Sequence, residues 1–366
     1  MGRFTGRRRP DPMMQTPHAP SRHKARATLL TLLVAAACVA LFAFTLRNVG
    51  LEEIGEGVRR LGWGGFATIL ALSGLRLVFR SLAWMRCVEG EPRLRFGEAL
   101  DATLMGEALG NATPFANVIS EPSKAAFVRG RVPFRSAFSA IVVENIFYTA
   151  SVALMIGIGA AAFLLAYSMP EYLRAVSYGA LVGVAVVIGA ACVLLKARVH
   201  PLSSAAGWLD ARSLVPVWVS GRIPRVRRFE DDITTFTARN GRSLAPLALY
   251  EAAFHLAGVA EVYVTLTLIV PGSVTLLTAL VVESTGRVIN VLFKFVPLRL
   301  GVDEAGNALL ALPLALLPAS LVTLALVRKA RILVWTAVGI GLLFRRGLSV
   351  RRALDHAQAV AGEAKG

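Results

Sequence analysis

The chain has 366 residues, of which 55% are apolar and 17% are charged, and its formal net charge is +17. A soluble domain usually has about 25% charged residues, so this composition leaves too little polar surface for a water-soluble fold. The basic residues stand at the ends of long apolar blocks, which is the positive-inside pattern of membrane proteins. They do not form the stripe with interleaved aromatic residues that binds nucleic acid. We therefore predict an integral membrane protein and no nucleic-acid partner.

The chain begins with a basic, proline-rich segment (1–26) that we predict to be a disordered cytoplasmic tail. The apolar run Ala27–Leu46 follows. It is nearly the length of a spanning helix and ends without a small-residue cleavage site, so we interpret it as a retained first helix and not as a signal peptide. Further spanning helices are predicted at Trp63–Val88, Phe134–Ala166, Arg174–Leu195, Ser243–Val270 and Pro318–Phe344.

The predicted domain organisation is simple. Residues 27–345 form a single membrane domain, and 346–366 form a second basic cytoplasmic tail. Between the predicted fourth and fifth helices, the segment 196–242 is polar and holds nine Lys or Arg residues. We predict that this segment is a large cytoplasmic loop, because loops on that side carry the excess of basic residues.

Two segments, Phe96–Val132 and Ser273–Leu317, fit neither a loop nor a spanning helix. Each begins as a moderately apolar helix of about 15 residues, breaks at a proline (Pro114 or Pro297) and continues into a second short helix. A helix of 10 to 15 residues is too short to span a bilayer and is typical of a re-entrant segment. We predict two re-entrant helical hairpins, one in each half of the chain.

The two halves correspond in sequence. Seven residues after the proline, the first half has Glu121 and the second has Glu304, so the offset between halves is 183 at both positions. A weak internal repeat of this kind is typical of transporters. We predict an all-α, polytopic fold with an inverted pseudo-repeat, about six spanning helices and both termini in the cytoplasm. With this orientation, only Arg47, Arg59, Arg60 and Arg174 lie on the outer side.

Ionisable residues lie within or beside the apolar blocks. Each costs about 2.5–3.5 kcal/mol at membrane depth, so such residues usually face a partner or a water-filled cavity. A cavity with charges of both signs suits a phosphate or zwitterionic headgroup, with Arg donating two hydrogen bonds to phosphate. We predict substrate-binding roles for Glu121, Lys124, Glu144, Glu283, Arg287, Lys294, Glu304 and Arg331. Other candidates are Arg76, Arg80, Glu107, Glu251, His255, Glu261, Asp303, Arg328 and Lys329.

Several of these candidates have structural interpretations that stay open. Arg76 and Arg80 are one helical turn apart and can each reach an interface by snorkelling. Glu283 and Arg287 are spaced i, i+4 and can form an ion pair within one helix. Glu251 and His255 share that spacing, but no third ligand stands nearby, so a hydrogen-bonded histidine is favoured over a metal site.

The chain resembles the flippase-like family that comprises the transmembrane region of lysylphosphatidylglycerol synthases and its stand-alone relatives. The resemblance covers Ala27 to about Phe344 and depends on short motifs. They are Gly106–Phe138, the triplet Val143, Glu144 and Asn145, Ser284–Asn307 with Pro297, Gly301 and Glu304, and Arg331. The resemblance implies translocation of lipids or lipid-linked molecules across the inner membrane.

The leading hypothesis is therefore a flippase or transporter of a lipid or lipid-linked precursor. The alternative is an integral-membrane accessory or transferase that acts on lipid headgroups with a partner enzyme that modifies lipids or transfers sugars. The chain has no P-loop, GxSxG or HExxH motif and no Cys/His cluster, so we expect no cofactor, no metal and no catalytic residue. Only 22 residues follow Phe344, so we expect no aminoacyl-transferase domain.

Overall fold

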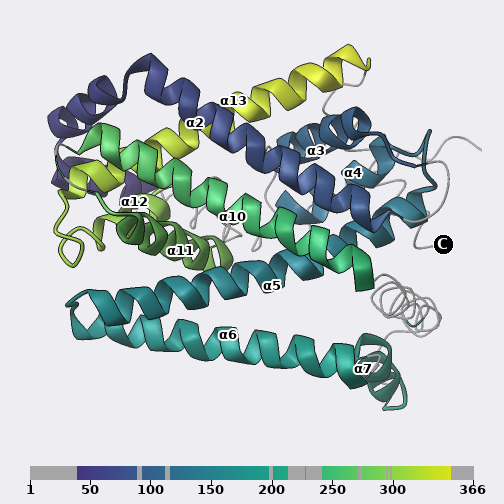
Figure 1. Cartoon of the computed structure of the whole chain (residues 1–366). Helices are drawn as coiled ribbons and strands as arrows, with labels where there is room; N and C mark the ends of the chain where they lie inside the picture. Colours follow the sequence, from purple (N-terminus) through teal and green to yellow (C-terminus); the bar gives the residue numbers. More distant parts are fainter. Residues whose placement is uncertain are drawn as a thin grey trace, which may run out of the picture. The chain divides into compact units, whose positions relative to one another are not determined.

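The computed structural model describes residues 39–88, 93–111, 116–197, 201–212, 227, 241–270, 272, 274–293, 296 and 299–347, and these belong to one compact unit, Cys38–Gly366. Over these residues the chain is helical and contains no strand. After a short helix at Val39–Val49 come α2 (Leu51–Cys87), α3 (Phe96–Asn111), α4 (Ala116–Phe127), α5 (Phe134–Ala166), α6 (Glu171–Ala197), α7 (Pro201–Asp210), α10 (Gly241–Ile269), α11 (Leu276–Leu292), α12 (Val302–Ala308) and α13 (Pro318–Arg345) (Figure 1).

Helix α2 has 37 residues but is two helical pieces, because Gly62 has the non-helical angles φ 60° and ψ 178°. The positive φ at this position is one that glycine adopts at little cost. The predicted start at Trp63 therefore coincides with the beginning of the second piece, and the predicted end differs from the observed Cys87 by one residue.

The long helices agree closely with the predicted ranges. Helix α5 has the predicted bounds, and α13 extends the predicted last helix by one residue to Arg345. Helix α6 begins at Glu171, three residues before the predicted start, and its acidic first residue faces the positive end of the helix dipole. Helix α7 lies within the predicted loop, whose other positions fall mostly outside the described residues.

Both unusual segments consist of separate helices. In the first, α3 and α4 have 16 and 12 residues, and in the second, α11 and α12 have 17 and 7 residues. All four are shorter than the roughly 20 residues that span a bilayer. The predicted breaks at Pro114 and Pro297 lie outside the described residues, although neither segment is one unbroken helix.

Four helices of the described chain are long and apolar enough to cross a membrane. They lie at Leu51–Cys87, Phe134–Ala166, Glu171–Ala190 and Leu244–Ile269. Helix α13 has 28 residues but carries three charged residues, Arg328, Lys329 and Arg331, near its middle. Because of these charges, it is not one of the four helices that are apolar enough to cross a membrane. Since the predicted first helix falls largely outside the described residues, the number of six spans stays a prediction.

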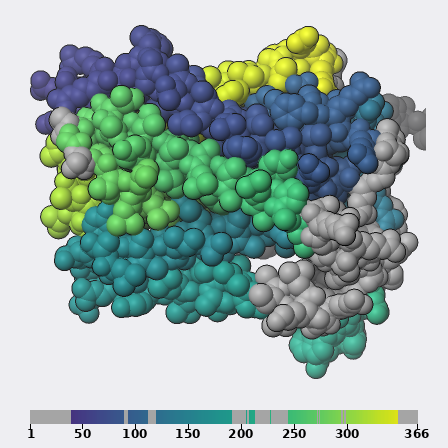
Figure 2. Space-filling model, viewed as in Figure 1, coloured from purple at the N-terminus to yellow at the C-terminus, as the bar shows by residue number. Residues whose placement is uncertain are grey.

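The helix contacts follow a regular pattern. Helices α2, α3, α4 and α5 of the first half can be matched in order with α10, α11, α12 and α13 of the second half. Each major contact between two of these helices then has a counterpart between the two matching helices. For example, α2 contacts α3 as α10 contacts α11, and α3 contacts α13 as α11 contacts α5. In Figure 1, α2 and α10 run in opposite directions side by side, and α5 and α13 also run in opposite directions. Figure 2 shows the same neighbours packed on one face, with α10 between α2 and the α5/α6 pair.

Close packing of α13 on α3 brings the two halves together. A Cβ added at Gly339 of α13 would lie 2.7 Å from the Ala108 Cβ and would overlap the Leu104 carbonyl oxygen of α3. Small residues at a helix crossing let membrane helices approach closely, which strengthens their van der Waals contact. This contact fixes the position of the charged middle of α13 relative to the first half.

Candidate functional site

Helix α2 supplies one arginine to each of two buried charge groups. Arg76 and Arg80 are one turn apart and each has a side chain that is only 12% exposed. Arg76 pairs with Glu261, and Arg80 pairs with Glu144. The structure thus favours ion pairing over snorkelling for both residues.

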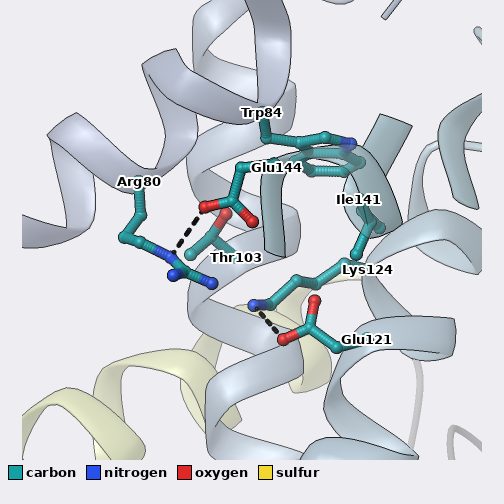
Figure 3. A pocket seen from close by; sticks show the side chains of 7 residues that line it. All are labelled: Arg80, Trp84, Thr103, Glu121, Lys124, Ile141 and Glu144. Carbon is teal, nitrogen blue, oxygen red and sulfur yellow. Dashed lines mark hydrogen bonds and ion pairs between the residues drawn. The ribbon is translucent and has the colours of Figure 1, made fainter. Parts of the chain in front are cut away.

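The first group forms a small pocket between α2, α3, α4 and α5 (Figure 3). Its charged side chains point toward the same space, as Figure 3 shows. The free space within the pocket is about 10 Å³, which is room for roughly one water molecule. We call this the acidic pocket; it is lined by Arg80, Trp84, Thr103, Glu121, Lys124, Ile141 and Glu144.

Ion pairs in and beside the acidic pocket join residues within α4 and residues of different helices. Lys124 Nζ lies 3.1 Å from Glu121 Oε1 and 3.0 Å from Glu107 Oε1 on α3. Arg80 Nε lies 3.1 Å from Glu144 Oε1. The charged residues that line the pocket are two cations and two carboxylates, so the lining has no formal net charge, and Glu107 adds a third carboxylate beside it.

Gly106 explains how Lys124 reaches Glu107. A Cβ at Gly106 would lie 2.6 Å from Lys124 Cγ and 3.0 Å from the Ser120 carbonyl oxygen. The absent side chain leaves room for the lysine stem to cross α3. Glu121 and Lys124, both predicted to bind substrate, thus form an ion pair, and the position of Lys124 depends on a glycine in another helix.

The second group, which we call the arginine cluster, lies between α2, α10, α11 and α13. Arg287 Nη2 lies 2.5 Å from Glu283 Oε1, which confirms the predicted i, i+4 pair. Arg76 Nη1 lies 3.2 Å from Glu261 Oε2 and its Nη2 lies 3.9 Å from Glu283. From α13, Arg328 pairs with Glu283 and Arg331 pairs with Glu261. The cluster consists of Arg76, Glu261, Glu283, Arg287, Arg328 and Arg331.

The arginine cluster has more positive than negative charge. Four guanidinium groups surround two carboxylates, and no side chain of the six is more than 16% exposed. Its formal charge is therefore +2. Among the described residues, Nε of Arg76 and Nε of Arg328 have no hydrogen-bond partner. The cluster thus has both charge and donors that its own carboxylates do not satisfy.

A third group surrounds the short helix α12 and is electrically balanced. Lys329 Nζ lies 2.9 Å from Glu304 and 3.1 Å from Asp303, which also pairs with Arg299 at 3.1 Å. Glu304 Oε2 accepts a hydrogen bond from the Gly301 backbone N–H at 2.9 Å. These contacts give Glu304 a helix-capping role, and its predicted role in substrate binding stays a prediction.

Tyr148 of α5 lies between the acidic pocket and the arginine cluster. The Arg80 guanidinium lies 3.9 Å from the centre of the Tyr148 ring, and Arg287 Nη1 donates a hydrogen bond to its hydroxyl at 3.4 Å. The sequence interpretation did not single out Tyr148 or Ser151. Both lie on the same helix face as Glu144, at i+4 and i+7. Polar residues at these spacings in an otherwise apolar helix are the sequence pattern that could have identified them.

The structure does not bring the eight predicted substrate-binding residues into one group. Glu121, Lys124 and Glu144 lie in the acidic pocket. Glu283, Arg287 and Arg331 belong to the arginine cluster, and Glu304 belongs to the third group. Lys294 lies outside the described residues. The predicted role of these residues in binding a headgroup stays a prediction, and the acidic pocket is lined by first-half residues alone.

Helices of spanning length around a buried, charged interior define a multi-pass membrane protein with polar sites at membrane depth. The chain belongs to the family of the lysylphosphatidylglycerol synthase TM region, whose sequence profile matches residues 28–341. No curated protein and no solved structure matches the chain.

Proposed function

We propose that this protein is a flippase or transporter of a lipid or lipid-linked precursor, and that the anionic headgroup binds at the arginine cluster. The observation that carries the proposal is the formal charge of +2 on four buried arginines and two glutamates. The membership in a family of lipid-related membrane regions supports the choice of a lipid as the substrate.

The physical reason is the cost of uncompensated charge away from water. A single ionised side chain at the bilayer centre costs at least about 2.5 kcal/mol, and the cluster has two more cations than anions. A phosphate group carries one or two negative charges and accepts paired hydrogen bonds from guanidinium groups. A phosphate with two charges would neutralise the cluster, and a phosphodiester with one charge would lower its formal charge to +1. Either would accept hydrogen bonds from Nε of Arg76 and Nε of Arg328, which have no hydrogen-bond partner among the described residues.

The acidic pocket lacks the positive charge of the arginine cluster and suits a different part of a substrate. Its carboxylates Glu121 and Glu144 would favour a cationic group, and Tyr148 connects the pocket to the arginine cluster. Its free space of about 10 Å³ holds roughly one water molecule. A headgroup would enter only after α4 moves relative to α5, so the described structure corresponds to a closed state in the proposed cycle.

The proposal includes an inverted repeat. Helices α2–α5 and α10–α13 would be the two units, each with a re-entrant hairpin, and the exchange of contacts described above supports this relation. In such transporters the units enclose a substrate site near the bilayer midplane.

We further propose an inner-membrane location, six spans and cytoplasmic termini. Residues 27–345 would form one domain, and an enzyme that makes or uses the lipid would act beside it.

Translocation in vesicles tests the proposal. The full chain is reconstituted with a fluorescent phosphatidylglycerol probe, and the rate at which the probe crosses the bilayer is measured by quenching from outside. We expect Arg331→Gln to lower this rate by about tenfold or more, because one charge-assisted hydrogen bond is worth about 1.5–3 kcal/mol. The matched control is Arg59→Gln, which removes an arginine with a 74% exposed side chain and should leave the rate unchanged.

Folding must be separated from function in this test. Each variant is compared with the parent for folded yield and thermal unfolding in the same detergent. The proposal fails if the parent moves the probe no faster than protein-free vesicles. The assignment to the arginine cluster fails if folded Arg331→Gln moves the anionic probe at the parent rate.

A further inference from the structure

One buried glutamate of the described chain is unlike the others. The buried glutamates are Glu144, Glu251, Glu261, Glu283 and Glu304. Four of them form ion pairs with Arg or Lys, whereas Glu251 forms none with a described residue. Glu251 is only 3% exposed and lies on α10, which is long and apolar enough to span the membrane. An ionised carboxylate without a counter-ion is costly in this position.

Glu251 is instead part of a hydrogen-bonded trio from two helices. Ser151 Oγ of α5 lies 3.2 Å from Glu251 Oε2, 3.0 Å from His255 Nε2 and 2.8 Å from the Tyr148 carbonyl oxygen of its own helix. His255 is also buried, at 7% exposure, and its ring stacks at 7° to the Tyr148 ring. Glu251 Oε1 and His255 Nδ1 are buried and have no hydrogen-bond partner among the described residues. Each end of the trio thus has an unsatisfied polar atom.

The order of the contacts argues against a catalytic triad. In a serine hydrolase, the carboxylate binds histidine Nδ1 and the serine binds Nε2. Here the serine lies between the two, and Nδ1 has no partner in the described structure. The described residues also contain no group of three His, Cys, Asp or Glu side chains that could hold a metal ion. The trio therefore suits proton transfer better than nucleophilic or metal chemistry.

We infer that Ser151, Glu251 and His255 form a proton-binding site that is coupled to the anion bound at the arginine cluster. The coupling rests on the proposed function; the proton-binding site itself does not. In the proton-free state, His255 Nε2–H donates to Ser151 Oγ, and the single Ser151 hydroxyl proton is directed to the Glu251 carboxylate and away from the Tyr148 carbonyl oxygen, which is also within reach. A proton from water then binds His255 Nδ1, the Nε2 proton passes to Ser151, and the Ser151 proton passes to Glu251. The result is a neutral histidine with its proton on Nδ1 and a protonated Glu251, so one proton has been gained and no bond other than O–H and N–H has changed.

Charged groups on the helices packed around the trio decide the sign of the coupling. An anion at the arginine cluster adds negative charge near Glu251 and so favours its protonation. By linkage, protonation of Glu251 strengthens anion binding by the same factor. Proton and anion are therefore expected to cross the membrane in the same direction. The titratable and charged groups on neighbouring helices that interact electrostatically with Glu251 or His255 are Arg76, Arg80 and Cys87 of α2, Glu144 of α5, and Glu283 and Arg287 of α11, and the Tyr148 ring stacks on His255.

Infrared spectroscopy tests the proton-binding site without any lipid transport. The purified full chain is titrated with acid and base, and the carbonyl band of a protonated carboxylic acid is followed. We expect a band that appears on acidification, is absent in Glu251→Gln and is shifted in frequency in Ser151→Ala, which keeps the carboxyl group. Glu171→Gln is the control, because Glu171 is an exposed carboxylate at the start of α6, and it should leave the band unchanged. A spectrum that is the same in the parent and Glu251→Gln would overturn the site.

A pH gradient tests the coupling. In vesicles that hold the full chain, translocation of the phosphatidylglycerol probe is measured with and without a gradient. We expect a gradient directed along the movement of the probe to accelerate it by about fivefold or more, the lower end of coupling between two ligand sites. Glu251→Gln, which is permanently neutral, should bind the anionic probe but lose the response. If the parent moves the probe at the same rate with and without the gradient, the coupling is wrong, but the proposed function is not contradicted. No translocation at all overturns the coupling and the proposed function together, and the infrared titration then decides the proton-binding site.

Discussion

The acidic pocket and the arginine cluster receive neighbouring arginines from α2 but differ in charge and in exposure. The pocket is lined by Glu121, whose side chain is 17% exposed, and it adjoins Glu107, which is 45% exposed. No side chain of the arginine cluster exceeds 16%. The charged residues that line the pocket balance one another, so the pocket needs no counter-ion. The excess of two cations in the arginine cluster requires a counter-ion, and this difference identifies the cluster as the better candidate for anion binding.

The largest expected effect is on Glu283→Gln. Glu283 pairs with Arg76, Arg287 and Arg328, so the substitution raises the formal charge of the cluster to +3. Removal of one partner from a buried ion pair costs about 3–5 kcal/mol. We expect a loss of this size in the free energy of unfolding, measured by denaturation in detergent. The double variant Glu283→Gln/Arg328→Gln should recover part of the loss, and equal losses in single and double variants would contradict the charge argument.

A smaller effect is expected for Glu121→Gln in the acidic pocket. Lys124 keeps its ion pair with Glu107 at 3.0 Å, and the Glu121 side chain is partly exposed, at 17%. We expect a loss of about 1 kcal/mol in the free energy of unfolding, the usual net value of one hydrogen bond. The same denaturation experiment measures it. A loss as large as that of Glu283→Gln would show that the pocket and the cluster do not differ in the proposed way.

The smallest effect is expected at the surface end of α2. Glu56 pairs with Arg59 at 3.6 Å and with Arg60 at 3.0 Å, and all three side chains are 44% exposed or more. Exposed pairs usually contribute less than about 1 kcal/mol, so Glu56→Gln should change the free energy of unfolding by less than Glu121→Gln. High salt should reduce this difference further, whereas it should have little influence on Glu283→Gln. A strong salt dependence of the Glu283→Gln effect would contradict its burial.

Pairs within a helix could be read from the sequence, but pairs between helices could not. The spacings of Glu283 with Arg287 and of Glu121 with Lys124 place each pair on one helix face, and both ion pairs are present. The pair Glu251 and His255 also shares a face, yet the residue that joins them is Ser151, 100 residues earlier than Glu251. Nothing in the local pattern of α10 indicates which residue of α5 lies opposite.

The sequence by itself determined the membrane class, the family and the bounds of the long helices, because hydropathy and charge act locally along the chain. It also determined that two segments are too short and too interrupted to span. Only the tertiary structure decided that Arg76 and Arg80 serve different groups, that Glu304 caps α12 and that four arginines share two glutamates. These arrangements depend on how α2, α10 and α13 pack, and packing is set by contacts between residues as far apart as Leu104 and Gly339.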